Sequence, residues 1–145
     1  MKSKLIHEAE QKTFALIFDS GDECVALLEQ FARDHRLSAA QITGIGAFQQ
    51  VALGYFDWEQ KSYLENRIDE QVEVVSLIGD VAEKDGEAKV HAHVVIAKRD
   101  GTAHGGHLLR ATVRPTLELI INESPFHLAK KHDPQSGLAL ISIDK

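Results

Sequence analysis

The sequence of 145 residues is long enough for one domain, residues 1–145, with a core that needs no disulfide bonds. Its composition, 43% hydrophobic and 26% charged, is ordinary for a globular protein, and no apolar run has the length of a membrane span or the form of a signal peptide, so we expect a cytoplasmic protein with no membrane contact. The net charge of −6, without a clustered block of lysine and arginine, argues against strong autonomous DNA binding.

The first predicted elements are a short strand and a helix. An apolar run predicts a strand at residues 13–18. Ser20, followed three residues later by Glu23, has the form of a capping box that would begin a helix. Apolar residues then recur with helical spacing, which predicts a helix that closes near residues 34–35. Cys24, which has no second cysteine to pair with, belongs to this apolar stripe, so we interpret it as core filling rather than a nucleophile.

The remainder of the chain is dominated by strand patterns. A short helical turn is expected at residues 37–41, an interruption at Pro115, and a turn or helix start at residues 124–127. Strands are expected at residues 42–48, 51–57, 61–68, 71–78, 88–98, 106–113, 116–122 and 138–143. One principal helix among many strands predicts an α+β fold with a mainly antiparallel sheet in a single compact domain.

Histidines gather in one short segment of the sequence. Four of the eight fall within it: His91, His93, His104 and His107. Residues two apart in a strand point to the same face, so His91 and His93 should project together. The residues between and after them are apolar and suit a core on the opposite face.

The position of His107 depends on how the chain turns back. Asp100-Gly101 predicts a hairpin. A strict two-residue turn would pair Val94 with His107 and leave His107 on the wrong face, so one extra residue is needed. We expect a bulge at Gly105-Gly106 to supply it, because glycine readily adopts positive φ.

Three neutral imidazoles on one face suit Zn²⁺ or another divalent transition metal, with a fourth position open to water or a small ligand. The alternative is that these histidines are exposed or hydrogen-bonded and hold no metal. Glu73, on a strand otherwise poor in charge, is a candidate base near a metal-bound water or a hydrogen-bond partner of a ligand histidine. Its alternative is an ordinary outward-facing glutamate.

At these residues the sequence resembles the PPC domain of plants and prokaryotes, also called the domain of unknown function 296. The resemblance runs from about residue 10 to residue 143. It is carried by Thr43-Gly44-Ile45-Gly46-Ala47, by the strand ending Leu77-Ile78-Gly79, and by His91-Ala92-His93 with Asp100-Gly101 and Gly105-Gly106-His107-Leu108.

This resemblance implies an α+β domain that assembles as a homotrimer. It also implies that His91, His93 and His107 bind a metal, usually zinc. Plant members carry an AT-hook ahead of the domain, and their DNA-binding label derives largely from it. No AT-hook is present in this sequence, which agrees with its acidic charge.

Two functions follow as hypotheses. The first is a trimeric metal-binding regulatory or DNA-associated module without its own AT-hook. The second is a metal-dependent, hydrolase-like enzyme that acts on a small molecule at the three-histidine site. The first is favoured because no substrate-positioning arginine or nucleophile accompanies the histidines in the sequence.

Overall fold

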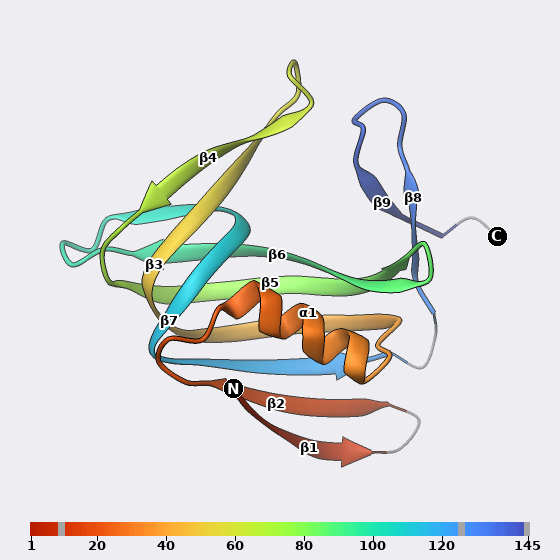
Figure 1. The fold of residues 1–145 in the computed structure, drawn as a ribbon, viewed down its shortest axis with the longest axis horizontal. Coiled ribbons are helices and arrows are strands. Elements are labelled where there is room, and N and C mark those ends of the chain that lie inside the picture. Colours follow the sequence, from red (N-terminus) through yellow and green to blue (C-terminus); the bar gives the residue numbers. More distant parts are fainter. Residues whose placement is uncertain (9–10, 125–126, 144–145) are drawn as a thin grey trace.

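Nine strands form one sheet, and a helix packs on one face of it in the computed structural model (Figure 1). The structure describes residues 1–8, 11–124 and 127–143, with only the backbone described for residues 3–8. In chain order the elements are β1 (Lys2–Glu8), β2 (Lys12–Phe18), α1 (Cys24–Asp34), β3 (Ala39–Asp57), β4 (Ser62–Ile68), β5 (Val72–Lys84), β6 (Glu87–Ala97), β7 (Ala103–Glu123), β8 (Ala129–His132) and β9 (Ala139–Ser142). The expected strand-rich fold with one principal helix is confirmed for these residues.

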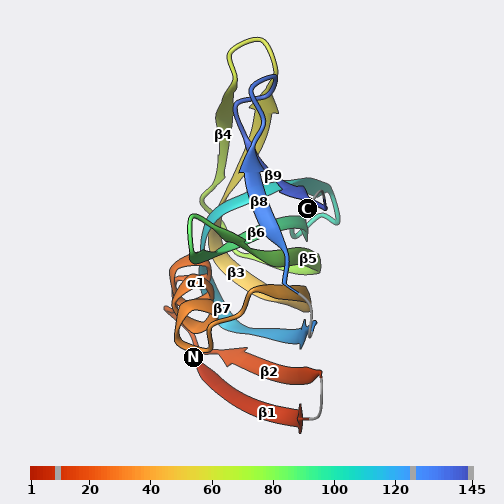
Figure 2. The same cartoon turned by 90° about the vertical axis from the view of Figure 1, so that its right-hand side faces the viewer.

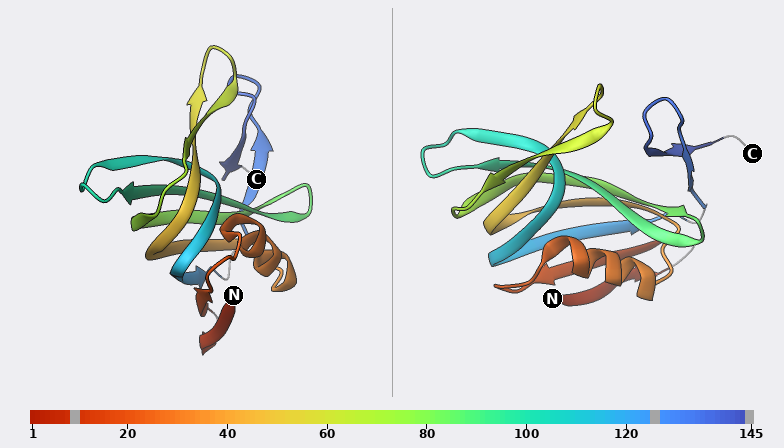
Figure 3. Two further views of the ribbon diagram at one scale, coloured as in Figure 1. Left: turned by 60° about the vertical axis from the view of Figure 1, so that its left-hand side comes forward. Right: turned by 45° about the horizontal axis from the view of Figure 1, so that its top comes forward.

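Two long strands organise the sheet. β3 pairs with β4, β5 and β7, and β7 pairs with β2, β3 and β6. Because β5 also pairs with β6, the strands β3, β5, β6 and β7 form a closed ring of pairings. β1 and β2 extend the sheet beyond it (Figure 2), and the β8–β9 hairpin rises away from the other strands (Figure 3). All these pairings are antiparallel except the single parallel contact of β5 with β8.

Both long strands continue where breaks were expected. Residues 42–48 and 51–57 belong to β3, which already begins at Ala39, so the helical turn expected at residues 37–41 is wrong. The register with β7 shifts around Gln49, and the strand passes through this irregularity without a turn. Pro115 likewise lies in an irregularity of β7, between Val113 and Leu117, the partners of Phe48 and Gly46. The regular pairing is interrupted there, so the missing amide hydrogen of proline removes no strand-pairing hydrogen bond. The strands β1 and β8 were not predicted, and residues 125–126 of the expected turn lie outside the described part of the chain.

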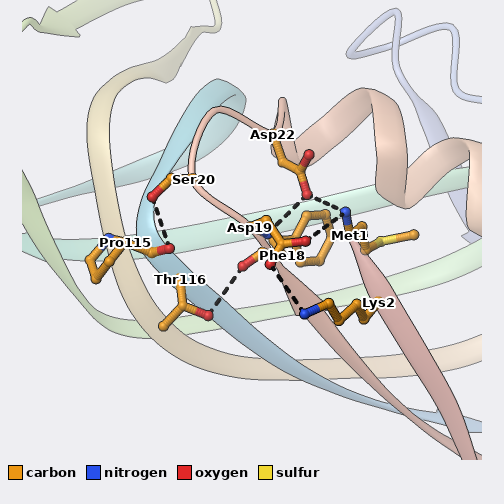
Figure 4. Close-up of polar contacts among 8 residues, drawn as sticks. All are labelled: Met1, Lys2, Phe18, Asp19, Ser20, Asp22, Pro115 and Thr116. Carbon is orange, nitrogen blue, oxygen red and sulfur yellow. Dashed lines mark hydrogen bonds and ion pairs between the residues drawn. The ribbon is translucent and has the colours of Figure 1, made fainter.

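The helix begins three residues later than a capping box with Ser20 as N-cap would require. Glu23 is the N-cap, and its side chain accepts a hydrogen bond of 2.6 Å from the amide of Ala26. Ser20 instead donates to the carbonyl of Pro115 at 3.1 Å, so its predicted capping role is wrong. Figure 4 shows how this loop is tied to β7 and to the first residue, whose ammonium lies 2.5 Å from a carboxylate oxygen of Asp22.

The two faces of the sheet differ in character. Toward α1 lie fully buried side chains such as Leu16, Ile42 and Leu119, which form one core with the helix residues Leu28 and Phe31. Cys24 is buried in this core, and burial raises the pKa of its thiol, as expected for a packing residue. The opposite face, here called the open face, carries exposed apolar side chains at Ile45, Val75, Ile78, Val95 and Ile120. No described helix is long and apolar enough to cross a lipid bilayer.

Candidate metal centre

His93 and His107 are direct partners across the β6–β7 ladder. Directly opposed residues of an antiparallel pair project to the same face, so both imidazoles lie on the open side. Ala92, Val94 and Ile96, which alternate with the histidines along β6, are buried in the core. The alternation predicted from the sequence therefore describes β6 correctly.

The register that brings His107 to this face is set at the turn. Lys98 pairs with Thr102 through a backbone hydrogen bond of 2.9 Å, so the turn contains three residues, Arg99, Asp100 and Gly101. Gly101 has φ +82° and donates its amide to the carbonyl of Lys98, which is the pattern of a type I turn followed by a left-handed residue. From residue 93 to 97 the ladder is then regular. The expected shift exists, but its predicted place at Gly105-Gly106 is wrong.

One potential ligand atom from each of His91, His93 and His107 lies within 4.8 Å of the other two. The Nε2 atoms of His91 and His93 are 3.2 Å apart. Two nitrogens bound tetrahedrally to one zinc ion, each at about 2.0–2.1 Å, would be about 3.3 Å apart. The spacing of the first pair thus fits a shared ion, and the third ring lies within reach of the same point.

Asp80 contacts His91 from the neighbouring strand. It is the register partner of His91 on β5, and its Oδ2 lies 3.4 Å from His91 Nδ1. Sequence reasoning missed this residue because it ended the strand at Ile78, whereas β5 continues to Lys84. The period-two pattern, continued across Gly79, would have placed Asp80 on the same face as Ile78.

Glu73 does not join the cluster. Its partners across the sheet are Ala97 on β6 and Ala47 on β3, whereas His93 is opposite Ile78. Glu73 is exposed and lies five residues before Ile78, the residue of β5 that is opposite His93. The structure therefore leaves the base role considered for Glu73 without a geometric basis.

The surroundings favour the neutral form of two of the imidazoles. Burial holds the pKa of His107 down to about 4, and the neighbouring His91, His93 and Lys130 act in the same direction. Burial, followed by the influence of His91, also lowers the pKa of His93. His107 Nδ1 is a buried nitrogen without a hydrogen-bond partner in the described part of the chain. Neutral imidazole is the form that binds a metal, so this donor set fits a divalent transition-metal ion.

An aromatic ring and a cavity border the cluster. Tyr63 of β4 stacks on His107, with ring centroids 4.6 Å apart and planes 27° apart. On the other side lies a cavity of about 350 Å³, bordered by His91, His93 and Ile78 among others. The cluster is thus packed on one side and accessible on the other.

The chain belongs to the family of the Plants and Prokaryotes Conserved (PCC) domain, whose model matches residues 6–125. A metal-containing protein of Archaeoglobus fulgidus is 36% identical, with 90% of this chain and 93% of that one covered and a TM-score of 0.83. A plant- and prokaryote-conserved (PPC) protein of Pyrococcus horikoshii is 31% identical, covering 99% and 96%, with a TM-score of 0.85. A protein of Ralstonia eutropha JMP134, named as a candidate DNA-binding protein, is 27% identical, covering 90% and 91%, with a TM-score of 0.84.

A much longer curated relative also contains a matching region. The bifunctional protein GlmU of Synechococcus sp. (strain JA-3-3Ab) is 29% identical over 128 residues, which are 86% of this chain. The chain spans only 19% of that protein's length. The match therefore concerns one region of a larger polypeptide.

Proposed function

We propose that His91, His93 and His107 together bind one divalent transition-metal ion, with zinc the best fit, in a homotrimeric regulatory module of the PPC family. The observation that carries this proposal is the convergence of three ring nitrogens within 4.8 Å. The lowered pKa values of His93 and His107 keep those rings ready to bind at neutral pH. The relative from Archaeoglobus fulgidus, itself metal-containing, supports the same assignment.

Three protein ligands leave one position of a tetrahedral ion free. A small molecule or a side chain of a partner would bind at that position only when the metal is present. Metal binding would in this way be coupled to the state of the assembly. His91, His93 and His107 would hold the ion, which supplies a Lewis-acidic centre when bound. A regulatory role is preferred because no carboxylate other than Asp80 contacts a histidine of the cluster in the described residues, and Asp80 is itself engaged with His91 and Lys130.

The open face supports self-association. Register partners place Ile120, Thr43, Ile78, His93 and His107 in one row across the sheet, so the apolar surface runs up to the cluster. Its exposed members are between 38% and 61% accessible, and hollows of about 450 and 510 Å³ lie among them. Monomeric proteins rarely leave such a continuous apolar surface uncovered. Further copies of the chain are the occupants expected from the homotrimer that the family implies.

DNA contact, if the module has one, would come through its partners. The relative from Ralstonia eutropha is named for DNA binding, but this chain has 22 acidic against 16 basic residues. Some exposed arginines of the described residues are paired with acids, as Arg67 is with Glu65 and Asp69, and the arginines without an ion pair, Arg36, Arg99 and Arg114, lie far apart in the sequence. Counterion release from phosphates, which drives DNA binding, needs unpaired clustered cations.

A metal-dependent enzyme is the second candidate. The cavity of about 350 Å³ beside His91 and His93 combines the apolar side chain of Ile78 with the polar side chains of Gln41 and Asp80. A small molecule bound there would reach the free position of the ion. Zinc-dependent hydrolysis of an activated ester, lost in His93→Ala, would favour this candidate over the regulatory module.

Metal analysis tests the proposed site directly. Untagged protein, purified without chelators, is analysed by mass spectrometry of its elements and then titrated with zinc by calorimetry. We expect up to one ion per chain and the loss of most zinc affinity in His93→Ala, with the fold and assembly retained. His104→Ala is the matched control, because His104 is exposed on the same hairpin but opposite buried Ile96 rather than within the cluster. Absence of metal in the wild type, even after zinc is added, would end the proposal.

A further inference from the structure

Asp80 lies between the histidine cluster and the C-terminal β8–β9 hairpin. Its Oδ2 contacts His91 Nδ1 at 3.4 Å, and its Oδ1 lies 3.1 Å from Nζ of Lys130 on β8. We propose that Asp80 is the positioning residue of the metal centre: its carboxylate holds the His91 ring with Nε2 toward the other imidazoles and, through Lys130, fixes the C-terminal hairpin to the same point. The first half of this inference rests on the proposed metal site, and the second half does not.

The two nitrogens of His91 have different surroundings. Nδ1 faces the carboxylate of Asp80, while Nε2 lies 3.2 Å from Nε2 of His93. A carboxylate accepts hydrogen bonds and donates none, so it selects the tautomer of His91 that carries its proton on Nδ1. That tautomer leaves the Nε2 lone pair free and directed at the cluster. Carboxylate partners of this kind orient ligand histidines and raise their basicity.

Lys130 supplies the counter-charge on the other side of Asp80. Its side chain is only 7% exposed, although it belongs to a short hairpin at the edge of the molecule. A nearly buried ammonium is costly unless it is paired, so the contact with Asp80 is a requirement for this packing. Burial alone would raise the pKa of Asp80, but the contacts with His91 and Lys130 outweigh it and lower the pKa. The carboxylate is thus shared between its two neighbours, with Oδ2 toward His91 and Oδ1 toward Lys130.

Besides the pair of Asp80 and Lys130, the segment that leads into the hairpin and its first strand contact the rest of the fold at several described residues. Ala129 forms one parallel bridge with Glu83, the amide of Glu83 donates to the carbonyl of Leu128 at 2.8 Å, the amide of Leu128 donates to the carbonyl of Ser38 at 3.2 Å, and His127 lies 3.8 Å from Glu83. Figure 1 shows β8 and β9 rising away from the sheet beside the end of β5. Among these contacts, the pair of Asp80 with the nearly buried Lys130 is the ion pair that joins β8 itself to β5. Disturbing Asp80 should affect the ring of His91 and the hairpin together.

Nuclear magnetic resonance of imidazole nitrogens tests the first half without any metal. In metal-free wild type, we expect the ¹⁵N shifts of His91 to report a proton on Nδ1 and a free Nε2. Asp80→Asn should lose this preference, because a carboxamide can either accept from or donate to Nδ1. Zinc affinity measured by calorimetry should fall about 10- to 100-fold in the same variant. Glu73→Gln, which neutralises another acid of β5 on the same face, should change neither reading.

Hydrogen exchange tests the second half. Peptides covering residues 128–132 should exchange roughly tenfold faster or more in both Asp80→Asn and Lys130→Met. Lys98→Met, which breaks the ion pair of Lys98 with Glu70 at the far end of β6, should leave these peptides unchanged. His91→Ala should also leave them slow, because Asp80 would keep its contact with Lys130.

The outcomes separate the two proposals. If the wild type binds zinc but Asp80→Asn retains both the affinity and the His91 tautomer, the positioning role is overturned while the metal site stands. If the wild type binds no zinc but the tautomer and exchange results hold, the metal site fails and the structural role of Asp80 stands. Unchanged exchange of the hairpin in both Asp80→Asn and Lys130→Met would overturn its attachment through this ion pair.

Discussion

Gly54 lies directly beneath the ring of Tyr63: a Cβ atom on Gly54 would stand 2.8 Å from Tyr63 Cδ1 and 3.4 Å from His107 Cβ. The absence of a side chain on β3 therefore lets the tyrosine of β4 settle onto the histidine of β7. Gly54 pairs with His107 of β7 on one side and with Glu65 of β4 on the other. Backbone pairing on both sides keeps these strands from moving apart to make room for a side chain. The packed side of the cluster depends on this glycine.

Gly54→Ala should displace the Tyr63 ring and loosen His107. We expect a loss of about 1–3 kcal/mol in the free energy of unfolding, as for other overpacked sites, together with weaker zinc binding. Urea denaturation and calorimetry measure the two effects. Tyr63→Phe keeps the stacked ring and should retain zinc affinity; a large loss there would show that the hydroxyl, rather than the stacking, matters.

Gly101 sets the register of the histidine hairpin through its positive φ. A side chain in this conformation costs roughly 1–2 kcal/mol, so Gly101→Val should lower the free energy of unfolding by about that amount. Arg99→Val, in the same turn but without a positive φ, should stay within about 0.5 kcal/mol of the wild type. Equal effects of the two substitutions would contradict the assignment of the turn.

Glu23 caps α1 and also joins the helix to β7. One carboxylate oxygen accepts from Ala26 and the other accepts from the amide of Ala111 at 3.0 Å. Glu23→Ala should cost about 1–2 kcal/mol in thermal or chemical unfolding. Ser20→Ala, which removes only a hydrogen bond to Pro115 in an exposed loop, should cost clearly less. The reverse order would restore the capping box expected from the sequence.

The imidazole of His107 makes the stability of the metal-free protein depend on pH. Its pKa is about 4 in the folded chain, mainly through burial, against an ordinary value of 6.5. Between these values the unfolded chain binds the proton and the folded chain does not, so the free energy of unfolding falls as pH drops from about 6.5 toward 4. Urea midpoints measured across this range should show a shallower slope in His107→Gln than in the wild type. His104→Gln, which replaces a histidine of the same strand outside the cluster, is the control.

The open face should govern assembly. Ile45 is 61% exposed at the centre of the apolar surface and lies away from the histidines, so Ile45→Glu would place a charge in the proposed contact between copies. We expect the proposed trimer to dissociate, as measured by sedimentation velocity, while zinc still binds. Leu64→Glu, an exposed apolar position on β4, is the control. A wild-type chain that sediments as a monomer would remove the basis for this prediction.

Period-two alternation was enough to predict the facing of His91 and His93, because β6 buries Ala92, Val94 and Ile96 on its other side. It could not predict Asp80, because the glycine at position 79 resembled the end of a strand. That glycine is in fact required where β5 and β6 approach, since a Cβ there would lie 2.5 Å from the carbonyl oxygen of His91.

Features that depend on contacts between residues far apart in the chain could also not be predicted from local sequence patterns. β7 continues past Pro115 because its register with β3 shifts there, and this shift cannot be recognised without knowing the pairing of the two strands. The burial of Lys130 depends on where the C-terminal hairpin docks, and no local pattern around Ala129–His132 specifies that place. The helix, whose apolar spacing is local, was predicted almost to the residue apart from its cap.

His93 and His107 form the last rung that joins β6 to β7. Beyond it β6 continues beside β5 alone, carrying His91, while β7 departs along β3. The cluster therefore lies where β6 and β7 separate, and His91 is on the part of β6 that is no longer paired with β7. An ion bound by all three imidazoles would therefore cross-link β6 and β7 at the end of their pairing. Removal of the ion should first open the β6–β7 hydrogen bonds next to His93 and His107.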